Sequence, residues 1–412
     1  MKIKLTLFLI FLVQLISAQN RIDYLTQNRV DLRTDIPNIT ETDFNIIGFG
    51  ALHGSSKSYE AELSLVKSLL EKNMLDYYII EANFSQAFFV QKYLETGDEK
   101  LLSELTYAFQ TMVSQEGTIQ TYNHWKNIRG LLKKHPDKSI KVIGCDVVNE
   151  YKFPVKHILR LSKDDGNWTQ RQVLEKAISQ EDLNSTVWNK ELNEKVKSFV
   201  QDYLSNKEKY STQIDDIWTF NHIIQTIDYN FQEKREREKI IFDNYLVLKS
   251  KLGLENKKQF IKYGYFHIQK YKEGNYPSFF TRLIENNIYT RENVITIIGY
   301  LTKSRVLWDK KYDKQGNYKG YTTKSGYGIS DYWKERFKGI KNLKKTKLSD
   351  LTMFMLNQDN SPYSKGTDLV EIKMFLKDYN TAKLKGKNTL QFVDYAILIS
   401  DSKEQIPIEE KK

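Results

Sequence analysis

The sequence predicts an α/β protein with a mostly parallel sheet flanked by helices. Short apolar segments rich in Ile, Val, Tyr and Phe recur along the chain, as the strands of a sheet covered on both faces do. Segments with helical periodicity separate many of them, which favours parallel strands joined by helices. The expected strands cover residues 44–50, 76–84, 139–148, 259–268, 293–301 and 394–401.

The helical segments follow the strands in order. Residues 56–73 place apolar side chains at helical spacing, and residues 85–96 and 121–135 are the next expected helices. Between about 150 and 255, apolar strand segments are absent and charged, helix-forming sequence dominates, which indicates a helical insertion or cap. Residues 309–328 are polar and rich in Gly and Tyr, which indicates a long loop or a hairpin.

The N-terminal segment has the pattern of a secretory signal peptide. Two lysines precede an apolar stretch that ends in Ser17 and Ala18, so we expect cleavage after residue 18. The apolar stretch is too short to span a bilayer. The single cysteine, Cys145, excludes an intrachain disulfide. These features predict a secreted or periplasmic protein without a transmembrane anchor, with one α/β domain over residues 19–408.

The charge of the chain excludes no partner by itself. Lysine and arginine give a formal net charge of +11 and are spread along the sequence without a basic stripe or a nucleic-acid motif. A solvated lysine-rich surface explains this pattern, and attraction to anionic surfaces is the alternative. We expect a small-molecule substrate and no nucleic-acid partner, and nothing in the sequence indicates an oligomeric state.

Ionisable residues stand at the ends of four expected strands. They are His53, Glu81, Asp146 and His267. Ligands of open α/β sheets bind outside the carboxyl ends of the strands, so parallel strands would bring these side chains to one edge. Each also has a structural alternative, because buried histidines and carboxylates often serve only packing and ion pairing.

His53 is the strongest candidate. Gly50 and Gly54 flank it in a strand-to-helix turn, where glycine permits positive φ or a close approach to a ligand. The helix that begins beyond the turn favours the neutral imidazole that a general base needs. Glu60, in the first turns of that helix, either supports the site or interacts with the helix dipole. The other four histidines, in helical or charged surroundings, are expected to be structural: His124, His135, His157 and His222.

Several segments together resemble the erythromycin esterase-like family, in the clan that includes haem-binding ChaN-type lipoproteins and Tiki-type metalloproteases. GFGALHG is similar to the family's Gly-rich strand end, with Glu60 seven residues after His53 and Glu81 closing the next strand, YYIIE. Four further segments match in order: YLETGDEKLL, KVIGCDVV, REKIIFDN and VDYAILISDSKEQIPIE. The resemblance runs from about residue 42 to 409.

The resemblance implies a metal-independent hydrolase that acts on an ester bond. His53 would activate water as the general base, and Glu81 would orient the imidazole of His53. His267 would match the second histidine of the family's downstream pair. The resemblance implies supporting or binding roles for five residues: Glu60, Asp146, Arg237, Glu238 and Asn244.

The sequence also departs from the family pattern. Gly50 stands where the family has a glutamate, Glu62 where it has an arginine, and Gly264 where it has the first downstream histidine. Erythromycin is therefore not the expected substrate, since residues that act as a unit are missing. Two other functions stay open. One is a metal-dependent hydrolase, because His53, His267 and the two carboxylates are suitable ligands for a divalent metal. The other is a binding protein of the same fold that has lost catalysis.

Overall fold

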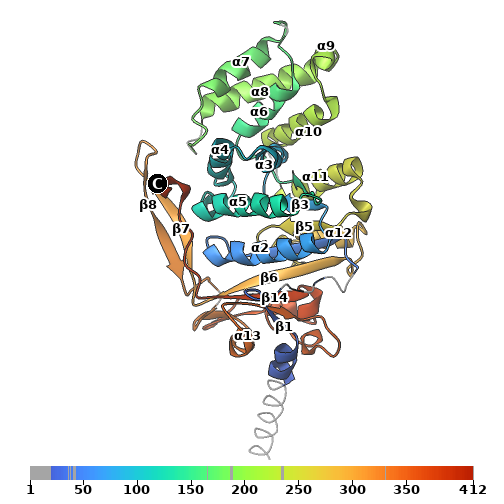
Figure 1. Ribbon diagram of the computed structural model, residues 1–412, viewed down its shortest axis with the longest axis vertical. Helices are drawn as coiled ribbons and strands as arrows, with labels where there is room; N and C mark the ends of the chain where they lie inside the picture. Colours follow the sequence, from blue (N-terminus) through green and yellow to red (C-terminus); the bar gives the residue numbers. More distant parts are fainter. Residues whose placement is uncertain are drawn as a thin grey trace, which may run out of the picture. The chain divides into compact units, whose positions relative to one another are not determined.

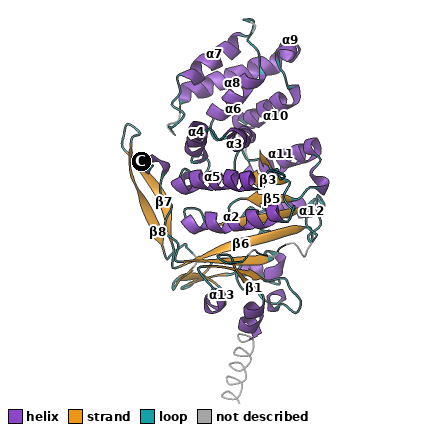
Figure 2. Cartoon of the chain, viewed as in Figure 1, coloured by secondary structure: helices purple, strands orange, loops and turns teal. Residues whose placement is uncertain are grey.

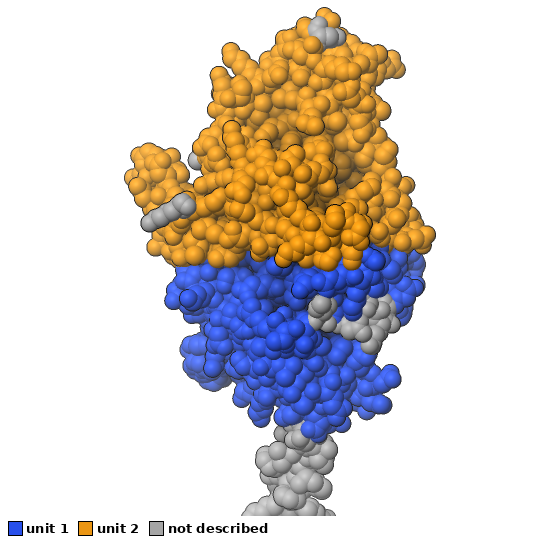
Figure 3. Space-filling model, viewed as in Figure 1, with its two compact units in different colours: residues 1–75, 258–308, 323–405 blue, residues 76–257, 309–322, 406–412 orange. Residues whose placement is uncertain are grey.

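The computed structural model describes residues 20–35, 37, 39, 43–164, 166–185, 189–232, 236–329 and 331–411. The predicted signal peptide, residues 1–18, lies outside the described residues. The chain forms two compact units, which Figure 3 colours separately. Unit 1 comprises residues 1–75, 258–308 and 323–405, and unit 2 comprises residues 76–257, 309–322 and 406–412.

Unit 1 is built on a mixed sheet with the strand order β1-β11-β14-β6-β2-β5. Figure 1 labels β1, β14, β6 and β5 of this sheet. Strands β14, β6, β2 and β5 run parallel, whereas β11 and β1 add antiparallel pairs at one side. The strands are β1 (Arg29–Asp31), β2 (Ile46–Ala51), β5 (Gln259–Lys262), β6 (Val294–Thr302), β11 (Leu351–Met355) and β14 (Tyr395–Ser400).

The central strands of unit 1 are buried along their whole length. Every residue of β2, β6 and β14 is buried, as expected for parallel strands covered on both faces. Helices α2 (Ser56–Glu71), α12 (Phe279–Glu285) and α13 (Ile340–Thr346) belong to this unit (Figure 2). Helix α2 buries Leu65, Val66 and Leu69 on one face and contacts β14. The predicted α/β class is confirmed.

Unit 1 also carries a small antiparallel sheet with the strand order β13-β12-β10-β9. Its strands are β9 (Asp331–Tyr332), β10 (Glu335–Phe337), β12 (Ile372–Met374) and β13 (Lys377–Asp378). The sequence does not predict this sheet, because strands of two or three residues are too short to show a periodicity.

Unit 2 begins with two parallel strands, β3 (Tyr77–Ile80) and β4 (Lys141–Gly144), which pair with Tyr78 opposite Val142. Three helices lie between them in the sequence: α3 (Phe84–Thr96), α4 (Glu99–Phe109) and α5 (Ile119–Lys134). The predicted helical segment over about 150–255 follows, with helices α6 (Lys152–Leu161), α7 (Thr169–Ser179), α8 (Lys190–Ser205), α9 (Lys207–Tyr210), α10 (Ile217–Asp228) and α11 (Arg237–Leu252).

The helical segment has a hydrophobic core of its own. Trp168 is fully buried there, and its ring stacks on Tyr210 at 4.2 Å and on Phe199 at 5.1 Å between centroids. No helix among the described residues of the chain combines the length and apolar character that crossing a bilayer requires.

Two segments differ from, or refine, the sequence expectations. The expected strand over 259–268 ends at Lys262, and the following residues form a turn in which the His267 N–H donates to the Gly264 carbonyl at 3.1 Å. Their apolar character reflects burial in a turn rather than strand pairing. The segment expected to be a long loop or hairpin is a hairpin of β7 (Arg305–Tyr312) and β8 (Tyr318–Ser325).

The turn after β5 packs directly on a glycine face of β2. A Cβ atom at Gly50 would lie 2.7 Å from the Tyr265 Cα atom and 3.0 Å from the Tyr263 carbonyl oxygen. A Cβ atom at Gly48 would lie 2.5 Å from the Phe280 ring. Two glycines on one face of a buried strand therefore allow the chain beyond β5 to approach β2 at backbone distance.

We expect Gly50→Ala to lower the free energy of unfolding by about 1–3 kcal/mol, because the new methyl group meets backbone that cannot rotate away. Urea titration measures this change. Gly130→Ala in helix α5 is the matched control, since a Cβ there meets no atom within 4 Å; it should stabilise the chain by about 0.5–1 kcal/mol. A Gly50→Ala variant as stable as the native chain would contradict the close packing.

Candidate functional site

His53 lies in the turn that joins β2 to α2. The side chain is half-buried, two residues beyond the end of β2. The adjacent Gly54 has φ of +88°, and a Cβ there would lie 2.4 Å from the Leu307 carbonyl oxygen. Next in the chain, Ser55 is fully buried, and its hydroxyl donates to the Ser402 hydroxyl at 2.8 Å. The turn that carries His53 is thus fixed on both sides by packed backbone.

His267 lies beside His53 in unit 1. A Cβ built on Gly264 would be 3.2 Å from His53 Nε2 and 3.4 Å from His267 Cδ2, so both imidazoles border the same glycine. The His267 carbonyl accepts from the Phe280 N–H at 3.0 Å, and the Tyr263 ring lies edge-on to its imidazole at 5.5 Å. Strand ends that are far apart in the sequence therefore bring two histidines together.

A cavity of about 170 Å³ opens at the same strand ends. Leu52, the neighbour of His53, and Tyr265, the neighbour of Gly264, both line it. The small sheet closes part of it with Glu335, whose carboxylate accepts from the Gly328 N–H at 2.6 Å. The other lining residues are Ile298, Gly299, Gly328, Arg336, Phe337, Ile372 and Tyr379. The cavity therefore adjoins the imidazole pair through the chain neighbours of His53 and Gly264, and neither His53 nor His267 is among its lining residues.

In unit 2, Arg237 joins the two carboxylates predicted at strand ends. Its Nε and Nη2 atoms donate to the two Asp146 oxygens at 2.9 and 2.6 Å, and Nη2 also donates to Glu81 at 2.8 Å. Both carboxylates are buried, with side-chain exposures of 0% for Asp146 and 6% for Glu81. Burial opposes the charge of Arg237, but hydrogen bonds and attraction from these carboxylates raise the pKa of its guanidinium above the ordinary value.

Asn244 and Glu238 belong to the same helix as Arg237. Asn244 is buried and donates from Nδ2 to the Cys145 carbonyl at 3.1 Å, which ties α11 to the end of β4. Glu238 is half-buried in the first turn of α11, where a carboxylate favours the helix dipole. The segment REKIIFDN thus holds the strand ends of unit 2 through Arg237 and Asn244.

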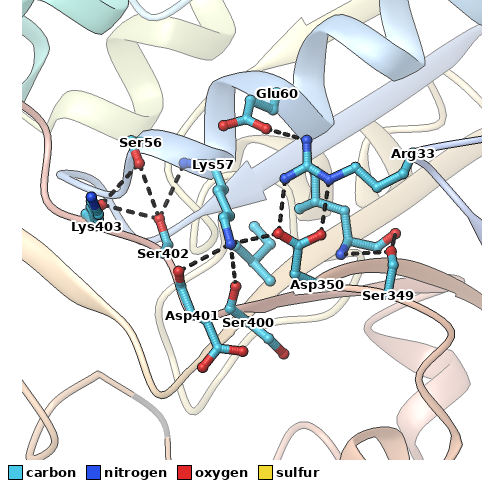
Figure 4. A network of polar contacts seen from close by, with 12 residues as sticks. Arg33, Ser56, Lys57, Glu60, Ser349, Asp350, Ser400, Asp401, Ser402 and Lys403 are labelled. Atoms are coloured by element: carbon cyan, nitrogen blue, oxygen red, sulfur yellow. Dashed lines mark hydrogen bonds and ion pairs between the residues drawn. The ribbon is translucent and has the colours of Figure 1, made fainter.

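Glu60 lies in an ion-pair network on the surface of unit 1 (Figure 4). Arg33 contacts Glu60 and donates two hydrogen bonds to Asp350, at 2.8 and 2.9 Å, and Lys57 lies 2.6 Å from the same carboxylate. Hydrogen bonds from Arg33 are the largest cause that lowers the pKa of Asp350 below its ordinary value. These contacts connect α2 with the start of β11.

The three departures from the family pattern have distinct surroundings. Gly50 has no room for a side chain, as shown by its contacts with the turn after β5. Glu62 is buried within α2, with 1% of its surface exposed. Gly264 leaves space for the two imidazoles.

Of the histidines expected to be structural, His157 and His222 are buried beside aromatic rings, and burial lowers their pKa to about 3 and about 4.

A second, larger cavity, of about 380 Å³, lies within unit 2, and no sequence pattern predicts it. Lys310 of β7 and Glu150, just before α6, line it and are both buried. Burial lowers the pKa of Lys310 to about 8 and raises that of Glu150 to about 7. Amide and hydroxyl side chains form much of the remaining wall: Gln110, Thr111, Ser114, Asn149, Ser185 and Asn189. No local pattern marks these residues in a lysine- and glutamate-rich chain.

The described residues contain no group of three or more His, Cys, Asp and Glu side chains placed to hold a metal ion. The four residues considered as ligands divide between the units. His53 and His267 belong to unit 1, and Glu81 and Asp146 belong to unit 2.

Neither protein-family models nor curated proteins match the sequence. Solved structures share its fold. A Bacillus cereus protein has a TM-score of 0.59 at 14% identity, covering 95% of this chain and 99% of its own. A succinoglycan biosynthesis protein has a TM-score of 0.61 at 15% identity, covering 94% and 98%. An erythromycin esterase, EreC with a histidine-to-asparagine mutation in its open conformation, has a TM-score of 0.54 at 10% identity, covering 89% and 93%.

These likenesses establish the fold alone, because function belongs to sites rather than to folds. They confirm a distant fold relationship to an erythromycin esterase, which the sequence resemblance predicts. A haem-binding ChaN of Campylobacter jejuni aligns with a TM-score of only 0.26, which supports no argument.

We expect Arg237→Met to lower the free energy of unfolding by about 3–5 kcal/mol, because it leaves two buried carboxylates without a counter-charge. Since burial favours protonated carboxyl groups, the variant should recover part of this loss as the pH falls. Urea titrations at neutral and mildly acidic pH measure the difference. An equal loss at both pH values, or none, would show that the guanidinium does not stabilise these carboxylates.

We expect the contribution of Glu150 to the free energy of unfolding to fall as the pH rises from about 4.3 to about 7. The lower value is the pKa of a glutamate in the unfolded chain, and the upper value is the raised pKa of Glu150 in the folded chain, about 7. In that window the folded chain holds a proton that the unfolded chain has released. Glu150→Gln should remove this fall. The free energy of unfolding of the variant should therefore rise relative to that of the native chain as the pH approaches neutral. Denaturation midpoints across this range measure it, and parallel curves for the two proteins would contradict the assignment.

Proposed function

We propose that this chain is a hydrolase of an ester or related acyl bond, with His53 as the general base. The observation that carries the proposal is the pair of imidazoles, His53 and His267, that border Gly264 at the ends of β2 and β5. The 170 Å³ cavity at the same strand ends supports it, because ligands of this fold class bind there.

In this mechanism the neutral His53 accepts a proton from water, and the water oxygen attacks the carbonyl carbon. The carbonyl oxygen becomes an oxyanion, for which His267 is the proposed donor. Collapse of the tetrahedral intermediate breaks the bond to the leaving alkoxide, which takes the proton from His53. The products are an acid and an alcohol, and the imidazole returns to its starting state.

The resemblance supports the proposed substrate class, and the names of two proteins of the same fold are compatible with it. One of these is named for erythromycin hydrolysis and another for succinoglycan biosynthesis. Gly50, Glu62 and Gly264 replace three polar groups of the family pattern, so we propose an ester other than erythromycin. The contacts of Asp146 and Arg237 favour a supporting role for both, since each already satisfies the charge of the other.

We also propose secretion or a periplasmic location, which the N-terminal segment supports. N-terminal sequencing of the mature protein should find residue 19 first, and an intact N-terminus would contradict cleavage.

We expect His53→Ala to reduce kcat/KM at least about 100-fold against any ester that the native chain hydrolyses, because general base catalysis contributes about 10²–10⁴. His135→Gln, a substitution at the end of α5, is the control and should leave the rate unchanged. A panel of esters and lactones, erythromycin included, is assayed with and without a chelator. Turnover that survives in His53→Ala overturns the role of His53, and turnover lost to the chelator favours a metal-dependent hydrolase.

The 380 Å³ cavity of unit 2 favours a second function, a ligand-binding protein that has lost catalysis. Its volume falls in the range of small-molecule sites, about 300–1,000 Å³. The cationic groups on its wall are matched by carboxylates, Lys310 by Glu409 and Lys152 by Glu181, which suits a neutral polar ligand. Ligand binding that persists in His53→Ala, together with no turnover by the native chain, would favour this function.

A further inference from the structure

Three large apolar side chains are exposed at one end of the small sheet of unit 1. Trp333 is 59% exposed, Phe375 is 56% exposed and Leu376 is 87% exposed. We call these three residues the apolar tip. Exposed apolar side chains that occur singly need no explanation, whereas a contiguous group marks an interaction site.

The strand pairing places the three residues together. Trp333 lies in the turn between β9 and β10, and Phe375 and Leu376 form the turn between β12 and β13. Glu335, the first residue of β10, pairs with both Tyr332 and Met374, so both turns leave the same end of the sheet. The Phe375 N–H donates to the Lys334 carbonyl at 2.8 Å, and the Trp333 and Phe375 rings meet edge to face at 5.5 Å.

Leu376 adopts an unfavourable backbone conformation in the turn between β12 and β13. Its φ is +60°, in the left-handed region that glycine and asparagine adopt at much lower cost. A leucine in such a turn forfeits stability and exposes most of its apolar surface to water. Strain of this kind is a reason to look for a function of the side chain.

Lysines flank the apolar tip. Lys334 and Lys377 are both exposed and directly adjoin it in sequence, and the Lys334 ammonium lies 4.8 Å from the centre of the Trp333 ring. The chain as a whole carries a net charge of +11. Apolar side chains flanked by two exposed lysines are complementary to a surface with an apolar interior and anionic head groups.

We propose that the apolar tip docks this protein on an anionic lipid bilayer. Phe375 and Leu376 enter the boundary of the acyl chains, Trp333 lies at the head-group level, and Lys334 and Lys377 contact the anionic head groups. A protein partner fits less well, because a stable interface buries about 800 Å² on each partner, more than three side chains at two turns supply. The proposal is independent of hydrolysis.

Co-sedimentation with phosphatidylcholine vesicles, with and without phosphatidylglycerol, tests the proposal. The mature chain, from residue 19 onward, should bind the phosphatidylglycerol vesicles more strongly than the neutral ones, and added salt should weaken binding. The triple variant Trp333→Ser, Phe375→Ser, Leu376→Ser should bind at least about tenfold more weakly. Because these side chains are exposed, the variant should retain the native urea midpoint.

Tyr276→Ser is the matched control, since Tyr276 is 77% exposed outside the apolar tip, and it should bind as the native chain does. Lys334→Glu combined with Lys377→Glu should lose the preference for anionic vesicles. Native binding by the triple variant, or no binding of the native chain to either vesicle, would overturn the proposal. Self-association that the triple variant abolishes, without vesicle binding, would replace it with an interface between copies of this chain.

Discussion

The close approach of the turn after β5 to the glycine face of β2 is the constraint on which the site of unit 1 depends. Gly48 and Gly50 leave no Cβ atoms between β2 and the segment that contains Tyr265 and Phe280. This packing brings Gly264 beside the turn after β2, so the imidazoles of His53 and His267 border one point. The same glycine face excludes a glutamate at residue 50, so the site cannot have the full polar set of the family it resembles. Geometry and chemistry are therefore linked at this strand.

Buried charge stabilises the strand ends in a different way in each unit. In unit 2, Arg237 forms ion pairs with Asp146 and Glu81, which follow two strands. In unit 1, Lys270 is buried and donates to Asp394 at 2.8 Å and to the Val294 carbonyl at 3.0 Å, beside the starts of β6 and β14. Such pairs contribute little net free energy relative to apolar packing, but breaking one partner is costly. In unit 2 the ion pairs hold the two carboxylates that follow β3 and β4, and in unit 1 the pair joins the starts of β6 and β14.

The sequence predicts the parts of this molecule that depend on local periodicity. All six expected strands are present, because buried parallel strands are continuous apolar segments, and the helices of the 150–255 segment follow from amphipathic spacing. The sequence predicts strand over residues 263–268, where the structure has a turn, because burial rather than pairing makes these residues apolar. The sequence singles out His53 and His267 by their places after strands. It cannot reveal that Arg237 forms ion pairs with the two carboxylates, or that Glu60 pairs with Arg33. Nor can it reveal that Lys310 and Glu150 line one cavity. All of these contacts join residues distant in sequence.

The central claim is that His53 and His267 act as one catalytic unit, and a double-mutant cycle tests it most directly. The rate of ester hydrolysis is measured for the native chain, for His53→Ala, for His267→Ala and for the double variant. Residues that act together lose most of the rate at the first substitution. The account predicts a double variant hardly slower than His53→Ala alone. Losses that multiply in the double variant would show that the two histidines contribute independently and would contradict a shared site.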